Sequence, residues 1–230
     1  MKQLHIKIAV ATILSALTVQ AQAAIVVTEV APWSSGNSPF AADWFELTNN
    51  GSSAVNISGW KVDDNSNSFA AAFALTGVSS IAAGQSVIFI ESASPVTTNA
   101  NFISTWFGST PPAGLTIANY SGAGIGLSAA GDAVNIYNAS GVLQANVTFG
   151  ASDAIVPYQT FDNAAGLNNA AISQLSVVGI NGAFVAANDL NEIGSPGSIA
   201  PVPEPSEYAM LLAGLAVVGG IARRRPLSFN

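Results

Sequence analysis

The chain has 230 residues, a formal net charge of −7, one histidine and no cysteine. The histidine is His5, and residues 24–200 contain a single cation, Lys61, against eleven acidic residues. Without imidazole, thiol or arginine, this part excludes a Ser-His-Asp triad, a cysteine nucleophile, a His/Cys zinc site and a disulfide. Its charge also excludes nucleic acid as a natural partner, since phosphate contacts come mainly from Lys and Arg.

The first 23 residues are typical of a secretory signal peptide. A short basic head, MKQLHIK, precedes an apolar run at residues 8–19, and Ala21-Gln22-Ala23 forms a small-residue cleavage site of the A-x-A type. We expect the secretion translocon to export the chain and a peptidase to cut after Ala23. Residues 24–199 then form one domain.

Short strands separated by turns follow the signal. IVVTEVA at 25–31 is the first, and DWFELTNN at 43–50 alternates, with Phe45 and Leu47 on one face and Trp44 and Glu46 on the other. AVNISGWKVDD at 54–64 continues the alternation, with Gly59 as a bulge or a close backbone approach.

Later segments repeat this pattern. SVIFIES at 86–92 is apolar through its middle, as a strand covered on both faces would be. Residues 133–137 and 142–149 form a hairpin through the loop at 138–141, with alternate residues from Leu143 pointing inward. Only residues 99–108 have helical spacing. Together these segments predict an all-β sandwich.

The order of these pieces resembles the lamin tail domain, an immunoglobulin-like β-sandwich. The resemblance is carried by five stretches of the sequence: VVTEVAP at 26–32, residues 43–64, residues 79–92, residues 126–150 and EIGSPG at 192–197. It implies a binding or structural module rather than an enzyme. The insertion between Ser92 and Gly124 and the segment after Gly150 depart from the family pattern.

The end of the chain combines a linker, an apolar run and a basic tail. Residues 208–222 carry no charge, and fifteen helical residues span roughly 22 Å, somewhat short of the ~30 Å core of a bilayer. Three arginines follow at 223–225, and the positive-inside rule places them in the cytoplasm. We therefore predict a linker at 200–207, a hydrophobic transmembrane helix at 208–222 and a cytoplasmic tail at 223–230.

This end resembles the PEP-CTERM sorting signal of Gram-negative bacteria. The resemblance is carried by six residues: Pro203, Glu204, Pro205, Arg223, Arg224 and Arg225. It implies that an exosortase, an integral-membrane cysteine protease, cuts near the triplet, so that the inner membrane tethers only the precursor. The mature form would then lie at the cell surface or outside the cell, in a biofilm or floc. The alternative is a permanent single-pass anchor.

Two groups of residues are candidate ligand sites. Asp63, Asn65 and Asn67 space oxygen atoms as the start of a calcium loop does, but Ser68 and Ala74 stand where that loop needs glycine and glutamate. We favour a solvated turn there, with a weak calcium site as the alternative and no other cofactor.

Glu29 and Glu46 lie on strands that look adjacent, so they could pair with Lys61, cap backbone groups or act as a carboxylate dyad. Structural roles are favoured for both. Most tryptophans of a small sandwich fill its core, and Trp33, within the loop-like WSSGNSP, is the one we favour for stacking on a sugar.

Three functions remain, in this order of preference. The first is a non-enzymatic surface or extracellular-matrix protein that binds exopolysaccharide or matrix proteins. The second is a carboxylate-based glycoside hydrolase, and the third is a calcium-dependent adhesin.

Overall fold

A computed structural model of the chain describes residues 25–121, 126–152, 155–198 and 214–215. Residues Ala23–Val202 form one compact unit. The predicted signal peptide, the Pro203–Pro205 triplet and the arginine tail lie outside the described residues. The predicted transmembrane helix does so too, apart from Gly214 and Leu215, which are helical. In the part of the chain that is described, no helix is both long and apolar enough to cross a membrane.

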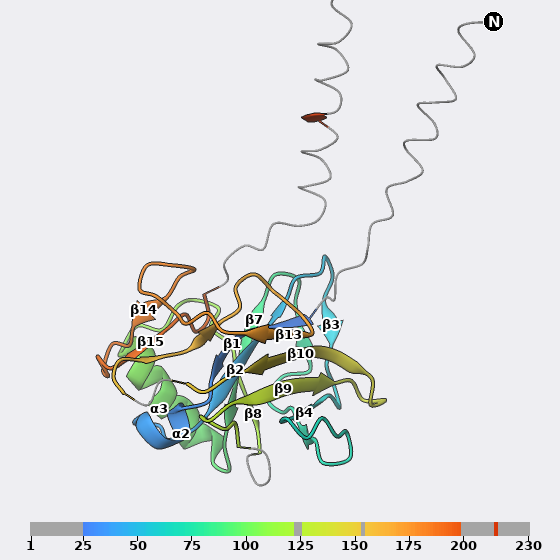
Figure 1. The fold of residues 1–230 in the computed structure, drawn as a ribbon, viewed down its shortest axis with the longest axis horizontal. Coiled ribbons are helices and arrows are strands. Elements are labelled where there is room, and N and C mark those ends of the chain that lie inside the picture. The colour runs from blue at the N-terminus through green and yellow to red at the C-terminus, as the bar shows by residue number, and fades with distance from the viewer. Residues whose placement is uncertain (1–24, 122–125, 153–154, 199–213, 216–230) are drawn as a thin grey trace, which may run out of the picture. The chain divides into compact units, whose positions relative to one another are not determined.

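Two five-stranded sheets make up most of the domain (Figure 1). The first sheet has the order β12-β1-β2-β7-β8 and consists of Phe161–Asp162, Ile25–Ala31, Trp44–Asn49, Ser86–Glu91 and Ile117–Tyr120. The second sheet has the order β13-β10-β9-β4-β5 and consists of Ala170–Ile172, Leu143–Phe149, Asp132–Tyr137, Lys61–Asp63 and Phe73–Ala74. The predicted all-β class is confirmed.

Smaller elements complete the fold. A third sheet has the order β11-β15-β14 and consists of Tyr158–Gln159, Glu192–Gly194 and Phe184–Val185. A two-stranded ribbon pairs β3, Val55–Asn56, with β6, Ser80–Ile81. The helices are α2, Ser34–Asn37, and α3, Pro95–Phe107. Helix α3 contains all of the predicted helical segment except Gly108, which is its C-cap, and it begins four residues earlier with proline in its first turn.

The main core lies between the two large sheets. Phe45 and Leu47 of β2 are both fully buried in it, together with Val134 and Ile136 of β9 and Val147 of β10. Because side chains alternate along a strand, Trp44 and Glu46 point to the opposite face of the first sheet. The predicted division of β2 into two faces is therefore confirmed.

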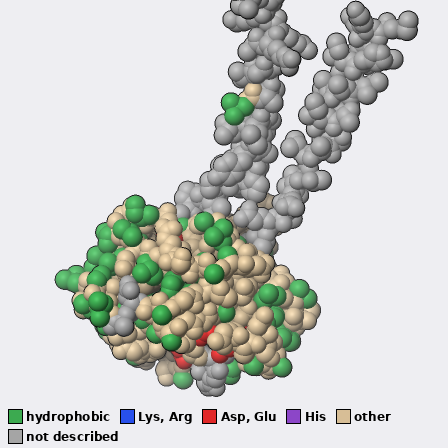
Figure 2. All heavy atoms as spheres, in the orientation of Figure 1, with side chains coloured by type: hydrophobic (Ala, Val, Ile, Leu, Met, Phe, Trp, Pro, Cys, Tyr) green, Lys and Arg blue, Asp and Glu red, His purple; other side chains and the backbone are tan. Residues whose placement is uncertain are grey.

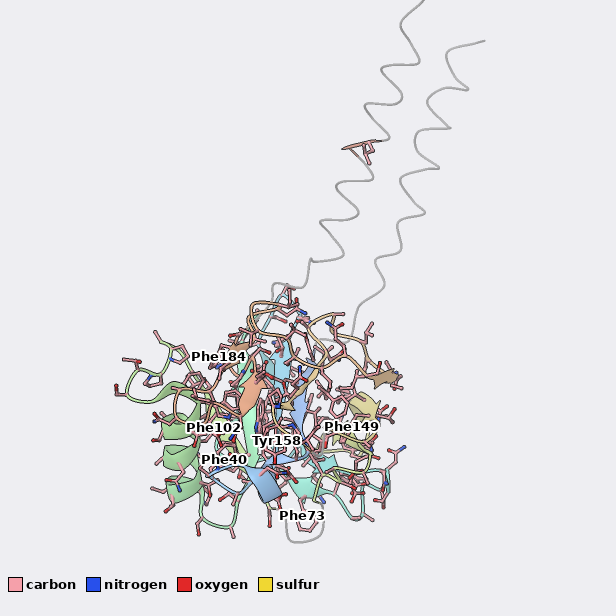
Figure 3. The ribbon with its side chains drawn as sticks, turned by 60° about the vertical axis from the view of Figure 1, so that its left-hand side comes forward. Phe40, Phe73, Phe102, Phe149, Tyr158 and Phe184 are labelled. Carbon is pink, nitrogen blue, oxygen red and sulfur yellow. The ribbon has the colours of Figure 1, made fainter. Side chains whose placement is uncertain are left out.

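The outer face of the first sheet is covered as well. Trp44 of β2 and Ile88 and Ile90 of β7 belong to a second, largely aromatic cluster with Phe102 and Trp106 of α3. Figure 3 shows Phe40 and Phe102 beside this helix and Phe184 on the same side of the domain, away from Phe149, which belongs to the main core. A strand covered on both faces is uniformly apolar, which explains the SVIFIES run.

Two local expectations differ from the structure. The segment predicted as one strand at 54–64 is split into β3 and β4 by a turn in which Gly59 has φ +77°. Leu143, predicted to point inward, is 38% exposed, because the register of β10 against β9 shifts between Leu143 and Ala145. The predicted hairpin itself is present, closed by Asn138 N–H donating to the carbonyl of Val142.

Candidate functional site

Glu29 and Glu46 lie side by side on the covered outer face of the first sheet. Their Cα atoms are register partners across β1 and β2, directly after a register shift between Val27 and Glu29. Each residue is only 1% exposed. The adjacency expected from the sequence is confirmed.

The two carboxyl groups bind the backbone near the end of the domain. Glu29 Oε1 accepts hydrogen bonds from Thr160 Oγ1 at 2.5 Å and from Ser195 N–H at 2.7 Å. Glu46 accepts from Thr28 Oγ1 at 2.8 Å and from Gly197 N–H at 2.7 Å. Of the roles considered for the pair, the structure therefore shows backbone capping.

Lys61 is engaged elsewhere and is not the partner of this pair. Its Nζ lies 4.7 Å from the centroid of the Phe69 ring, on the second sheet. Burial is the largest cause that raises the pKa of both glutamates, and for Glu29 the neighbouring Glu46 adds to it. A carboxyl pair with this little exposure offers no surface to a sugar chain.

Trp33 fills the aromatic cluster. Its side chain is 1% exposed, its Nε1–H donates to the carbonyl of Gln159 at 2.9 Å, and its ring stacks on Tyr158 with centroids 5.4 Å apart. The loop-like sequence around it is the short helix α2. In this position Trp33 has no free ring face for stacking on a sugar.

The predicted calcium loop is a hydrogen-bonded turn. Asp63 is fully buried, and its Oδ2 accepts hydrogen bonds from Ser66 Oγ at 2.7 Å and Ser68 N–H at 2.6 Å. Asn65 offers its N–H to Asp132 Oδ1, and Asn67 accepts a hydrogen bond from the Tyr137 hydroxyl. The three predicted ligands therefore lie within one loop but have separate partners.

No group of three or more His, Cys, Asp or Glu side chains able to hold a metal ion occurs among the described residues. The calcium site stays a prediction, which a melting temperature measured with and without calcium would test.

A hollow of about 460 Å³ lies between the start of β2, the end of β7 and helix α3. We call it the hydroxyl hollow. Five hydroxyl residues, one glutamate and three alanines line it: Ser35, Ser92, Ser94, Thr98, Ser121, Glu91, Ala41, Ala42 and Ala93.

Backbone bonds between neighbouring strands fix the position of the hydroxyl hollow. Glu91 N–H donates to the carbonyl of Asp43, and Ser92 N–H donates to the carbonyl of Tyr120, each at 2.9 Å. Helix α3 is attached by Asn99, whose side-chain amide exchanges hydrogen bonds with that of Asn119. The hollow therefore rests on rigid elements.

One acidic residue, Glu91, lines the hydroxyl hollow, and a second, Asp43, is buried behind it. Asp43 is 2% exposed and accepts a hydrogen bond from Ser35 N–H at 2.7 Å. Burial raises the pKa of Asp43 to about 7, and burial also raises the pKa of the half-buried Glu91. The hollow thus combines hydroxyl groups with one lining carboxyl group whose pKa is raised by burial.

The hydroxyl groups keep unused hydrogen-bonding capacity. Ser92 Oγ and Thr98 Oγ1 are 2.7 Å apart, Ser92 Oγ also accepts a hydrogen bond from Ser94 N–H at 2.9 Å, and Thr98 Oγ1 lies 3.2 Å from the Ser94 carbonyl. Because a hydroxyl can make three hydrogen bonds in total, each of the two can form one more. Figure 2 shows a face of neutral polar and apolar side chains with little acidic surface, and no described Lys or Arg is visible on it. A neutral, polyhydroxylated ligand is the class that such a hollow fits best.

Sequence reasoning missed the hydroxyl hollow. Its residues come from five separate stretches, and none of them forms a motif. The one available signal was the serine-rich flank SAS directly after the buried strand β7, together with acidic residues at the ends of β2 and β7.

Comparison with protein families gives one match. The model of the Lamin Tail Domain family matches residues 18–151, which is more than half of the chain and contains strands β1 to β10. No curated protein matches the chain. The segment from Ile155 to Ser198 lies beyond the matched region.

Proposed function

Because the chain belongs to the lamin tail domain family, we propose that it is a non-enzymatic exported binding protein of the bacterial cell surface or extracellular matrix. Its ligand is a neutral exopolysaccharide, bound at the hydroxyl hollow. Matrix proteins are the alternative ligand class.

The hydroxyl hollow is the observation that supports this proposal. Its volume of about 460 Å³ accommodates one or two sugar units, within the range of ligand sites generally. Serine and threonine hydroxyls and Glu91 supply donors and acceptors for sugar hydroxyls, and the alanine methyl groups supply small apolar contacts. The scarcity of cations disfavours anionic polymers.

Export and sorting form the second half of the proposal. The signal peptide directs the chain across the inner membrane, and the apolar run at 208–222 tethers it until an exosortase cuts near Pro203-Glu204-Pro205. The order of triplet, apolar run and arginines in the sequence supports this step.

Retention on immobilised neutral polysaccharides, dextran and cellulose among them, tests the binding function. We expect the chain to be retained on at least one of these polymers and to pass through a column of anionic alginate. Thr98→Val, which removes a hydroxyl from the hollow, should weaken retention, whereas Thr97→Val on the same helix should not. Equal behaviour of the two variants would contradict a site at the hydroxyl hollow.

The mature C-terminus tests the sorting step. Mass spectrometry of the chain from cells with and without exosortase should show an end near residue 203 only when the protease is present. An intact C-terminus in both strains would favour the permanent anchor instead.

A carboxylate-based glycoside hydrolase is the second candidate. The observation that favours it is Asp43, a buried acid whose pKa is raised to about 7, which lies behind the hollow and accepts a backbone hydrogen bond from Glu91, a residue that lines it. Turnover of aryl glycosides that Glu91→Gln abolishes and Asp64→Asn leaves unchanged would establish this function. Absence of turnover together with polysaccharide retention would favour the binding protein.

A further inference from the structure

Large apolar side chains are exposed mainly in one part of the described domain. Of eleven such residues between 25 and 198, eight lie within residues 155–190. Figure 2 shows hydrophobic side chains on the part of the surface where Figure 1 places β14 and its loops. Single exposed apolar residues need no explanation, but their concentration in one segment indicates a surface that contacts something.

The loop at 177–183 presents three of these side chains. Val177, Val178 and Ile180 are 52%, 53% and 50% exposed. The loop is a closed double turn, because Ile180 N–H donates to the carbonyl of Val177 at 2.9 Å and Gly179 N–H to that of Ala183 at 2.8 Å. It therefore holds three branched apolar side chains in a fixed arrangement on the surface.

The described part of the domain ends against this loop. A Cβ placed on Gly182 would lie only 2.7 Å from Cβ of Ser198. Nine residues, 199–207, separate Ser198 from the apolar run that begins at Tyr208. Fully extended, nine residues reach about 30 Å, so a tether in the membrane would keep this side of the domain close to the lipid surface.

We propose that the apolar loop at 177–183 is a membrane-contacting surface that rests on a zwitterionic lipid bilayer while the C-terminal run is still in the membrane. This inference depends on the tether in the proposed function and not on the polysaccharide site. The domain has no cluster of Lys or Arg that would select anionic headgroups, so the contact is apolar. Cleavage of the tail would release the domain and leave the loop free.

Single cysteines test the proposal directly, because the chain has no native cysteine. Val178→Cys is labelled with a polarity-sensitive fluorophore, and the full chain is placed in phosphatidylcholine vesicles that carry a nitroxide quencher near the headgroups. We expect a blue shift and loss of most of the fluorescence at position 178.

Two further labels separate the possible outcomes. Val142→Cys is a matched control, since Val142 is 56% exposed on the hairpin loop of the second sheet. Its label should stay in water. Leu215→Cys reports whether the apolar run enters lipid.

A blue shift at 215 together with quenching at 178 but not at 142 supports the proposal. A blue shift at 215 without quenching at 178 would overturn it and leave the tether intact, while no blue shift at 215 would overturn both. A blue shift at 178 without vesicles would indicate a second copy of the chain as the occupant and would also overturn it. Polysaccharide retention is measured separately, so failure of the binding site is distinguishable from each of these results.

Discussion

The region that matches the family and the segment that follows it are built in different ways. Residues 25–151 contain strands of up to seven residues, joined by backbone ladders over an apolar core. In residues 155–198 no strand is longer than three residues, and side chains of the first sheet bind the backbone near the end of the segment. The difference shows that this segment belongs to the domain, because it adds edge strands to both large sheets and completes the cover that α3 begins on the outer face of the first sheet.

The comparison is tested most severely by removing the segment. A chain that ends at Gly150 should lose cooperative unfolding, because it uncovers Trp33 and removes the backbone partners of the buried glutamate pair. A chain that ends at Ser198 should unfold as the longer chain does. Circular dichroism during heating measures the unfolding of both shortened chains. A stable domain ending at Gly150 would show that the fold does not need the segment.

A single methyl group added at Gly194 should weaken the contact between β15 and the outer face of the first sheet. At Gly194, a Cβ would lie 2.8 Å from Glu29 Oε1 and 2.9 Å from Cη2 of Trp106. We expect Gly194→Ala to lower the free energy of unfolding by roughly 1–3 kcal/mol, the usual cost of overpacking. Gly36→Ala is the control, since nothing lies within 4 Å of its added methyl group. Denaturant unfolding compares the two, and equal stabilities would contradict the close packing of β15.

The pH dependence of stability tests the buried acids. Burial raises the pKa of Glu29 and Glu46, and that of Glu192 to about 8, above the values near 4.5 expected in the unfolded chain. The folded state then binds more protons than the unfolded state between about pH 4.5 and pH 8, so stability falls as pH rises through this window. The melting temperature should therefore be higher at pH 5 than at pH 8.

A neutral isostere refines this prediction. Glu46→Gln removes one buried charge and its repulsion on Glu29, so the loss of stability between pH 5 and pH 8 should become smaller. Asp64→Asn, which removes a negative charge from a half-buried loop position away from the pair, is the matched control. A melting temperature of the unaltered chain that rises from pH 5 to pH 8 would refute the explanation.

The last prediction concerns one hydroxyl group. Thr160 Oγ1 donates to Glu29 and lies 2.7 Å from Ser176 Oγ, all within the buried contact. Thr160→Val keeps the shape but leaves polar partners unpaired, which costs about 1–3 kcal/mol. Thr148→Val, on the exposed face of β10, should be nearly neutral. Chemical denaturation measures the free energy of unfolding of both variants. Similar values would contradict a stabilising hydrogen bond between Thr160 and Glu29.

The sequence was sufficient to predict the sandwich of the matched region because five of its strands, β1, β2, β7, β9 and β10, have six or seven residues. Phe45 and Leu47 show this directly, since both lie in the main core. The later segment has strands of two or three residues, too short for any periodic signal. Its position is set by Glu29 and Glu46, whose backbone donors, Ser195 and Gly197, are more than 150 residues away along the chain.

The candidate sites were less predictable than the fold. Local sequence around Trp33 resembled an exposed loop, but tertiary packing buries its ring against Tyr158. The Asp63 turn had ligand-like spacing, yet spacing alone does not show which groups already have partners. The hydroxyl hollow arises only when the ends of three strands meet, so no single stretch of sequence contains it.

The binding function has one direct test. Isotope-labelled chain ending at Ala200 is titrated with oligosaccharides of the retained polymer, and amide chemical shifts are followed by NMR. We predict shifts that map to Glu91, Ser92, Ser94 and Thr98, with none at the loop 177–183. Shifts confined to other surfaces, or no shifts at saturating concentration, would contradict a polysaccharide site at the hydroxyl hollow.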